Sequence, residues 1–487
     1  MFRACLACAL LCCASAPVVA AITAPLPDAA ATALPHDRAV ARVTTLAHAD
    51  QQYSLYLPAD YTPQRRWPLL IVLDARGRGE DTLRLALEGA RSNGWIVMSS
   101  HQSRSDTAES TTLQALQALL DEAAQRYAYD RRRLYLAGFS GTAKTLWTVV
   151  APLRGQLAGM IGCGGGRPPE LGPLRLPQPA FFGMAGNGDF NYQEMRALDA
   201  ELAQAGAVHR LAIFDGGHEW PADPAVFAAA IDWLELMAMR AGTAPRREAW
   251  IDAQLARARL AVAAAPDALQ RWRLGEQLAR DFDGLRDMQA ERDAAARLAG
   301  SAEVRAGLAD EHRLRAAERR HAQRFDEWRA RAGQRFVEGR RQDPPSAARA
   351  LSELRIGRLR EQAAADDPAV AASARRSLER DYVATAFYLP EQLVAQGDLP
   401  RAAAMLAIAS AIFPERPQPH WRRAQVLALD GDANGAFAEL QACAQLGYGD
   451  PANLRRDPAW QRLRDDPRWA GMLAAIEAAT AAESPSP

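Results

Sequence analysis

The sequence predicts an α/β domain followed by an all-α domain, and three observations support this. From about residue 50 to 241, short apolar runs alternate with helical segments, the pattern of a mostly parallel sheet with helices on both faces. From residue 246 onward the strand pattern stops, and Ala, Arg, Leu and Glu recur at helical spacing. Within the first of these regions, near residue 140, an apolar run ends in a glycine-flanked serine and continues as a helix.

The size and composition of the chain limit what it can be. With 487 residues it is too long for one ordinary domain, and 49% hydrophobic and 24% charged residues are typical of globular proteins. Lys+Arg and Asp+Glu are equal at 58 each, and no basic stripe is interleaved with aromatic residues. The composition therefore lacks the electrostatic footprint of a nucleic-acid-binding protein.

The first 21 residues are expected to be a secretory signal peptide. Arg3 precedes an apolar stretch from Ala4 to about Ala16, and small residues follow up to Ala21. This leader predicts export to the periplasm or beyond. No later stretch approaches the roughly 20 apolar residues that spanning a membrane requires, so no span is expected in the mature chain.

Cleavage of the leader would leave two cysteines, Cys163 and Cys443. The other four, Cys5, Cys8, Cys12 and Cys13, lie within the leader. A disulfide framework and a thiolate metal site are therefore not expected. Because the two remaining cysteines lie in different halves of the chain, an interdomain disulfide and two separately buried thiols both remain open.

The α/β domain is expected over residues 45–241. The runs expected as strands are 53–57, 69–73, 95–99, 134–137, 157–161, 180–184 and 211–214. The helices expected between and after them are 81–92, 111–127, 142–150, 192–205 and 224–239. Only 163–178, a glycine- and proline-rich segment, separates two of the strands, which is too short for a helical cap. The site is therefore expected to be open and suited to a bulky substrate.

The remainder is expected to be helical in two parts. Residues 246–381 form a charged amphipathic region, and residues 382–480 contain a 34-residue period in which Gly397 recurs as Gly431 and Ala402 as Ala436. This period resembles the tetratricopeptide repeat, a helical hairpin with small residues where its helices cross. Residues 450–478 resemble a terminal cap. Such repeats imply either a protein or peptide partner or a purely stabilising role.

The segment Leu-Tyr-Leu-Ala-Gly-Phe-Ser-Gly-Thr, residues 134–142, points to nucleophilic catalysis. A serine nucleophile must be raised clear of the sheet, beside a base and beside amides that can receive an oxyanion. A strand-to-helix turn at Ser140 would do this.

An acid and a base follow at the ends of later strands. Asp189 lies in a glycine-rich loop after the run 180–184, and His218 follows the run 211–214. The carboxyl ends of parallel strands share one edge of a sheet, so we expect Ser140, Asp189 and His218 to converge. Asp215 and Asp223 remain alternatives to the acid, and His101 could also line the site.

Residues 50–241 resemble the α/β-hydrolase fold, and within it the lidless bacterial esterases that are similar to polyhydroxyalkanoate depolymerases and feruloyl esterases. The resemblance rests on the motifs at 73–79, 138–141, 187–192 and 216–218. It implies that the backbone N–H of Gly141 and that of Arg76 or Gly77 form the oxyanion hole. The sequence departs from the family pattern G-x-S-x-G at Thr142, where the family has glycine.

These residues predict a serine hydrolase that cleaves a carboxylic ester through an acyl-enzyme. A serine peptidase of the prolyl-oligopeptidase type has the same order of catalytic residues and is one alternative. An inactive hydrolase-fold scaffold with a tetratricopeptide-like binding surface is another. No cofactor is expected, because H-E-x-x-H and the phosphate-binding G-x-x-x-x-G-K-[ST] motif are absent from the sequence.

Overall fold

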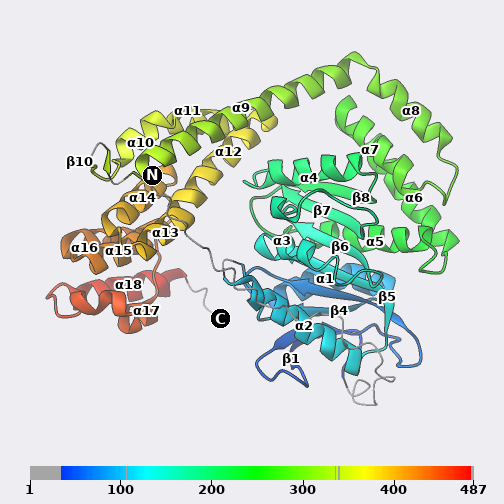
Figure 1. Ribbon diagram of the computed structural model, residues 1–487, viewed down its shortest axis with the longest axis horizontal. Helices are drawn as coiled ribbons and strands as arrows, with labels where there is room; N and C mark the ends of the chain where they lie inside the picture. The colour runs from blue at the N-terminus through cyan, green and yellow to red at the C-terminus, as the bar shows by residue number, and fades with distance from the viewer. Residues whose placement is uncertain (1–33, 106, 335, 338–339, 484–487) are drawn as a thin grey trace, which may run out of the picture. The chain divides into compact units, whose positions relative to one another are not determined.

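The computed structural model describes residues 34–105, 107–334, 336–337 and 340–483 (Figure 1). The predicted signal peptide, residues 1–21, lies outside the described residues. The chain divides into two compact units. The first runs to Val304 without the segment Gly188–Phe190, and the second contains this segment and residues 305 onward.

The first unit is built on an eight-stranded sheet with the order β1-β2-β4-β3-β5-β6-β7-β8 (Figure 1). The strands are β1 Ala39–Thr44, β2 Gln52–Tyr56, β3 Trp67–Leu73, β4 Ile96–Ser100, β5 Tyr129–Phe139, β6 Leu157–Cys163, β7 Ala180–Gly186 and β8 His209–Phe214. The pairs β1–β2 and β2–β4 are antiparallel, and all the other pairs are parallel. All seven predicted strands are present. Strand β1 was not predicted, because most of this edge strand is solvent-accessible and its residues show little apolar alternation.

Both faces of the sheet are covered by helices, as predicted. In β3, Leu70 and Val72 belong to one apolar core, whereas Leu69 and Ile71 belong to the other. Successive side chains of a strand point to opposite faces, so a strand buried on both sides is apolar throughout. The first core includes residues of α1 Gly79–Asn93 and α5 Pro224–Arg240, and the second includes residues of α2 Glu109–Arg126, α3 Gly141–Thr148 and α4 Tyr192–Gln204. This architecture is that of an α/β-hydrolase fold.

Three further helices belong to the first unit, which corrects the predicted boundary at residue 241. They are α6 Glu248–Ala263, α7 Ala268–Asp281 and α8 Gln289–Ala299. Ile251 and Leu255 of α6 are buried in the same core as α1 and α5. Trp233 of α5 donates its indole N–H to Asp281 of α7 at 2.8 Å. A short amphipathic helix has the same sequence pattern whichever domain its apolar face covers, so periodicity alone could not place these helices.

The second unit is almost entirely helical. Its helices are α9 Ala302–Ala332, which begins just before the boundary, α10 Ala347–Glu353, α11 Ile356–Ala363, α12 Pro368–Val383, the π-helix η3 Ala384–Tyr388, α13 Leu389–Ala395, α14 Leu399–Ile412, α15 Gln418–Asp430, α16 Ala433–Gln445, α17 Pro451–Arg456, the 3₁₀ helix η4 Pro458–Leu463 and α18 Trp469–Glu483. One antiparallel pair of two-residue strands, β9 Phe336–Val337 and β10 Arg340–Arg341, interrupts them. The prediction of helix alone is wrong here, because strands this short leave no alternating pattern.

The 34-residue period corresponds to two consecutive helix pairs, α13–α14 and α15–α16. Gly397 and Gly431 both have a positive φ, 71° and 89°, in the turn within each pair. Ala402 and Ala436 are both 0% exposed, as expected of small residues where two helices cross. The repeat is thus present in the fold, and membership of the tetratricopeptide family stays a prediction.

The two cysteines within the described residues, Cys163 and Cys443, are both thiols. Cys163 and Cys443 are fully buried, and neither is part of a disulfide. Burial, together with the nearby charge of Glu439, raises the pKa of the Cys443 thiol to about 12. Of the two alternatives from the sequence, separately buried thiols describe this structure.

None of the helices within the described ranges has the length and apolar character needed to cross a bilayer.

Candidate active site

Ser140 occupies a strained turn between β5 and α3. Its φ is 56° and its ψ is −123°, a combination that is costly for any residue with a Cβ. The turn is held by the Ser140 N–H, which donates to the Cys163 carbonyl at 2.8 Å, and by the Ser140 carbonyl, which accepts from the Lys144 N–H at 3.2 Å. Strain of this kind raises a nucleophilic hydroxyl above the sheet. The structure therefore forms the turn that the sequence predicts.

Glycines next to the turn allow close backbone contacts. A Cβ at Gly138 would lie 2.7 Å from the Ala143 nitrogen, and a Cβ at Gly165 would lie 2.2 Å from the Ser140 carbonyl oxygen. Real Cβ atoms essentially never show such distances. Both positions therefore require glycine for the turn to keep its shape.

Thr142, the departure from the family pattern, is accommodated by hydrogen bonds. Its side chain is fully buried. The hydroxyl accepts from the Phe139 N–H at 3.0 Å and lies 2.5 Å from the Leu73 carbonyl, to which it can donate. Thr142 thus connects the carboxyl ends of β3 and β5, two residues after the nucleophile.

The structure brings Ser140 and His218 together. His218 Nε2 lies 2.8 Å from Ser140 Oγ, a hydrogen-bond distance. The imidazole ring also packs on Phe139, with ring centroids 4.8 Å apart and planes tilted by 37°. The ring is therefore fixed beside the hydroxyl whose proton it would take.

The loop that carries His218 is held against the end of β7. A Cβ at Gly186 would lie 2.3 Å from the Gly217 carbonyl oxygen and 2.4 Å from that of Gly216. The Asn187 N–H donates to the Phe214 carbonyl at 2.8 Å, and its side chain donates to Asp215 at 2.9 Å. The ends of β7 and β8 are thus fastened together immediately before His218.

The candidate acid Asp189 lies in the segment Gly188–Phe190 and is 0% exposed. The residues that bound this segment are anchored in the first unit. Asn187 contacts the end of β8, as described above, and the Asn191 side chain donates to the Gly164 carbonyl at 2.8 Å. Asp189 is therefore two residues from an anchor on either side.

The alternatives to Asp189 and His218 have other roles in the structure. Asp215 accepts from Asn187, and Asp223 is the N-cap of α5, where it accepts from the Ala225 N–H at 2.9 Å. His101 is buried between the first two strands, with its Nε2 atom 3.0 Å from both Ser54 Oγ and the Ala41 carbonyl. Each of these residues therefore has a structural explanation without catalysis.

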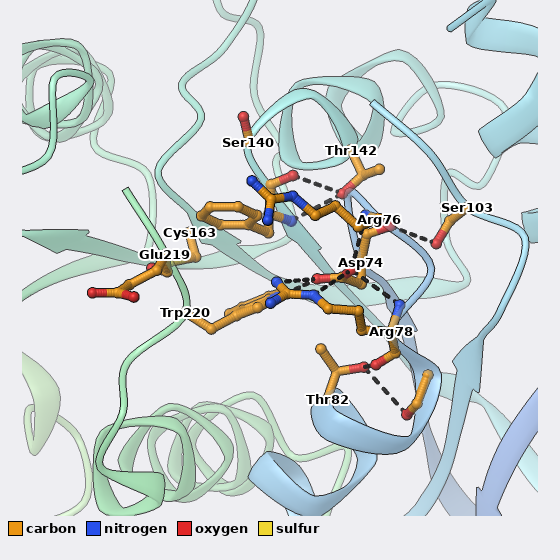
Figure 2. Close-up of polar contacts among 12 residues, drawn as sticks. Asp74, Arg76, Arg78, Thr82, Ser103, Ser140, Thr142, Cys163, Glu219 and Trp220 are labelled. Carbon is orange, nitrogen blue, oxygen red and sulfur yellow. Dashed lines mark hydrogen bonds and ion pairs between the residues drawn. The ribbon is translucent and has the colours of Figure 1, made fainter. Parts of the chain in front are cut away.

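Asp74, a buried carboxylate that the sequence did not single out, lies in the middle of a group of polar contacts near Ser140 (Figure 2). Asp74 is 0% exposed and accepts from the Arg76 and Arg78 N–H groups, at 2.8 and 3.1 Å. The Arg78 guanidinium adds two hydrogen bonds, at 3.2 and 3.1 Å, and Trp220 donates its indole N–H at 2.9 Å. Asp74 thus joins the loop after β3 to the loop that carries His218.

Two opposing effects set the pKa of Asp74. Burial alone would raise it, but the hydrogen bonds from Arg78 and Arg76 and the charge of Arg78 together hold the pKa below its ordinary value. The carboxylate is therefore charged whenever the protein is folded near neutral pH. The segment Asp-Ala-Arg-Gly could have indicated this, because aspartate favours turns in which its side chain accepts from the N–H two residues on.

This cluster engages the N–H groups of both residues that the family resemblance offers for the oxyanion hole. The Arg76 N–H donates to the Asp74 carboxylate, and the Gly77 N–H donates to the Asp74 carbonyl at 3.2 Å. Both N–H groups thus take part in hydrogen bonds within their own turn, and their role in the oxyanion hole stays a prediction. Gly141 begins α3, and a helix provides no internal acceptor for its first N–H groups, so its predicted role is compatible with the fold.

A hydroxyl near Gly141 was also not anticipated. Ser105 Oγ lies 2.6 Å from where a Gly141 Cβ would stand. This oxygen is buried, and within the described part of the chain it has no hydrogen-bond partner. The Ser105 N–H donates to the Ala75 carbonyl at 2.8 Å, which holds the residue beside the loop after β3.

No group of three or more His, Cys, Asp and Glu side chains that could hold a metal ion is present among the residues that the structure describes.

Several solved structures are similar to part of the chain. Esterase 2 of Thermogutta terrifontis, phosphonylated by cyclosarin, is 14% identical with a TM-score of 0.34, and the match covers 42% of this chain and 94% of that one. The fluorophosphonate-binding serine hydrolase F of Staphylococcus aureus is 14% identical with a TM-score of 0.32, covering 40% and 97%. The S-formylglutathione hydrolase of Staphylococcus aureus is 14% identical with a TM-score of 0.33, covering 41% and 98%. No family model and no curated protein matches the sequence.

Proposed function

We propose that the first unit is a serine hydrolase that cleaves carboxylic esters. The observation that carries this proposal is the 2.8 Å contact between Ser140 Oγ and His218 Nε2 at a backbone turn with positive φ. A nucleophile and a base at this distance, with the nucleophile on a strained strand-to-helix turn, form the working pair of acyl-transfer enzymes.

The proposed reaction has two halves. Ser140 Oγ attacks the ester carbon while its proton passes to His218 Nε2, and the tetrahedral intermediate collapses as His218 returns the proton to the departing alcohol. Water then attacks the acyl-enzyme and loses a proton to His218. The bond between the acyl carbon and Ser140 Oγ breaks, His218 returns the proton to Oγ, and the carboxylic acid leaves. Bonds and protons balance without a cofactor.

Asp189 is the proposed partner that orients His218. Its full burial, the anchors at Asn187 and Asn191, and the structural roles of Asp215 and Asp223 support this choice. A buried carboxylate in this role holds the imidazole in one tautomer and stabilises its cation.

We assign the oxyanion to the N–H of Gly141 and, as the second donor, the hydroxyl of Ser105. The position of Gly141 at the start of α3 and the unpartnered, buried Ser105 Oγ beside it support this assignment. One such donor typically contributes roughly 10²–10³ in turnover.

The substrate is proposed to be bulky. Between β6 and β7 the structure has only a three-residue 3₁₀ helix, η2 Pro169–Leu171. This connection contains no helical cap that would limit the size of the acyl or alcohol group.

The test is active-site labelling with a fluorophosphonate probe. Wild-type protein and Ser110→Ala, which changes an exposed serine of α2, should be labelled, whereas Ser140→Ala should not. Equal labelling of Ser140→Ala, or no labelling of the wild type, would reject the proposal. A panel of aryl and alkyl esters with one dipeptide amide separates an esterase from a peptidase, which would cleave the amide faster.

The inactive-scaffold alternative has lost its support in the sequence. It depended on Thr142, and the hydroxyl of Thr142 is built into the turn that presents Ser140. Export and a protein partner of the repeat region remain proposals from the sequence. N-terminal sequencing of the protein recovered from the periplasm or medium, with cleavage near residue 21, would test export.

A further inference from the structure

Four arginines line one cleft of the second unit, between α9, α11 and α12. Arg320 and Arg324 come from α9, and Arg355 and Arg358 come from the start of α11. The cleft has a volume of about 190 Å³. Figure 1 shows α11 and α12 alongside α9. We propose that this cleft binds a phosphate group, either as inorganic phosphate or as part of a small phosphomonoester.

The charge of the cleft is not neutralised within the unit. None of these four arginines has a carboxylate partner within the described residues, although other arginines of the unit are paired, such as Arg416 with Glu379. The cleft contains one carboxylate, Glu318, which is already bound by Arg376 of α12. His321 at the same wall is hydrogen-bonded to buried Asp381 at 2.8 Å. The cleft therefore keeps a net positive charge.

Without a bound anion, repulsion between these arginines destabilises the protein. Arg320 and Arg324 are four residues apart on one helix, and Arg355 and Arg358 are three apart, so like charges face each other across single helical turns. A bound oxyanion would remove this repulsion. The planar guanidinium matches phosphate oxygens with two parallel hydrogen bonds, which makes arginine the usual residue for this ligand.

The backbone at Arg355 provides independent support. Its φ is 57° and its ψ is 39°, the left-handed region. Glycine adopts this conformation without strain, whereas an arginine does not. A strained residue whose side chain lines a cleft is expected where the side chain is needed for binding.

The start of α11 adds partial positive charge. Arg355 is the N-cap of α11, and no side-chain hydrogen bond caps this helix. Both Arg355 and Arg358 line the cleft, so the first turn of α11 borders it. Uncapped N–H groups at a helix start favour anions. In this case they act together with four guanidinium groups.

The other residues of the cleft support a small phosphomonoester as one of the two proposed ligands. Leu314, Leu359 and Val370 give part of the wall apolar character, and Ser373 and Ser377 of α12 add hydroxyl groups. A phosphate group on a small apolar body would meet both kinds of surface.

The test is calorimetric titration of the full-length protein with inorganic phosphate and with phenyl phosphate, at constant ionic strength set by chloride. Wild-type protein should bind at least one of them, and Arg320→Gln with Arg324→Gln should weaken binding at least tenfold. The matched control is Arg319→Gln, which removes a neighbouring exposed arginine that does not line the cleft, and it should bind as the wild type does. Tighter binding of phenyl phosphate would identify a phosphomonoester, and equal binding would identify the phosphate group alone.

The variant Arg355→Gly distinguishes a loss of phosphate binding from a loss of folding. This variant should have a higher midpoint of thermal unfolding than the wild type while binding phosphate more weakly. Absence of binding to the wild type at 10 mM of either ligand, roughly the weakest useful affinity, would overturn the proposal. An equal loss of binding in Arg319→Gln would also overturn it, because the effect would then belong to surface charge in general.

Discussion

Trp220 donates its indole N–H to the buried carboxylate of Asp74 at 2.9 Å. Trp220 lies two residues after His218, and Asp74 begins the loop after β3. The hydrogen bond therefore fixes the loop that carries His218 to the central strands of the sheet. The rings of Phe139 and Phe227 pack against the same indole, each with its centroid 5.6 Å away.

Trp220→Phe should impair catalysis as well as stability. The change keeps an aromatic side chain but replaces the indole with a smaller phenyl ring and removes the donor. This leaves a buried carboxylate oxygen without one partner and costs about 1–3 kcal/mol. We expect kcat/KM for a small ester to fall about tenfold. Trp233→Phe is the matched control, because it removes an equivalent indole–carboxylate bond, to Asp281, away from Ser140. If both variants keep full activity, Asp74 and Trp220 do not position His218.

Gly186→Ala should displace the loop before His218. The new Cβ would overlap the Gly216 and Gly217 carbonyl oxygens, and a shift of about 1 Å at a catalytic group lowers the rate by roughly 100-fold. Gly217→Ala has no atom within 4 Å of its new Cβ and should behave as the wild type. Ester hydrolysis and near-ultraviolet circular dichroism measure the effect. Equal activity of the two variants would contradict the explanation.

The hydroxyl of Thr142 should contribute more to the stability of the fold than its methyl group does. Thr142→Ser keeps the bonds to Phe139 and Leu73, and we expect it to unfold close to the wild-type midpoint. Thr142→Val has nearly the same shape but leaves the buried Phe139 N–H without an acceptor, at a cost of about 1–3 kcal/mol. Chemical denaturation compares the two. The opposite order of stability would show that packing, and not hydrogen bonding, decides this position.

Ser105→Ala should lower kcat with little change in KM. The hydroxyl is proposed to stabilise the oxyanion, so its loss should slow turnover by roughly 10²-fold or more. Ser103→Ala, which removes a hydroxyl bonded to the Asp74 carbonyl at 2.8 Å, is the control for a structural serine in the same loop. An unchanged kcat in Ser105→Ala would exclude the hydroxyl as a donor.

Asp74 should contribute to stability only above the pH at which it is protonated. Because its pKa is lower in the folded than in the unfolded protein, its contribution is complete above the unfolded value of about 4 and is lost as the pH falls through the folded value. The difference in unfolding midpoint between wild type and Asp74→Asn should thus be constant from pH 7 to 5 and shrink below pH 4. A difference that is the same at pH 3 would contradict the lowered pKa.

The sequence could predict the parts of the fold that carry a regular pattern. The buried parallel strands are continuous apolar runs, so their number after β1 and the position of Ser140 at a strand end could be predicted. The position of His218 followed from the same reasoning, since it stands after the last such run.

Features that depend on distant contacts could not be predicted. Helices α6–α8 belong to the first unit because of the apolar surface that their buried residues cover, and the sequence does not show which surface that is. Strand β1 has too little alternation of apolar and polar residues to be predicted as a strand. The Arg76 and Gly77 N–H groups donate to Asp74. That Asp74 is a buried acceptor can be recognised only in the fold, where Arg78 and Trp220 also donate to it. A family resemblance transfers a position without the hydrogen bonds around it, so the second oxyanion donor stays a prediction.

The burial of Ile251 and Leu255 beside α5 decides where the chain can be shortened. A fragment that stops at residue 241 would leave the apolar surface of α5 in water, and aggregation is the expected result. A fragment that continues to residue 304 keeps this surface covered. Crystallisation trials and activity screens of the hydrolase unit alone should therefore begin from the longer fragment.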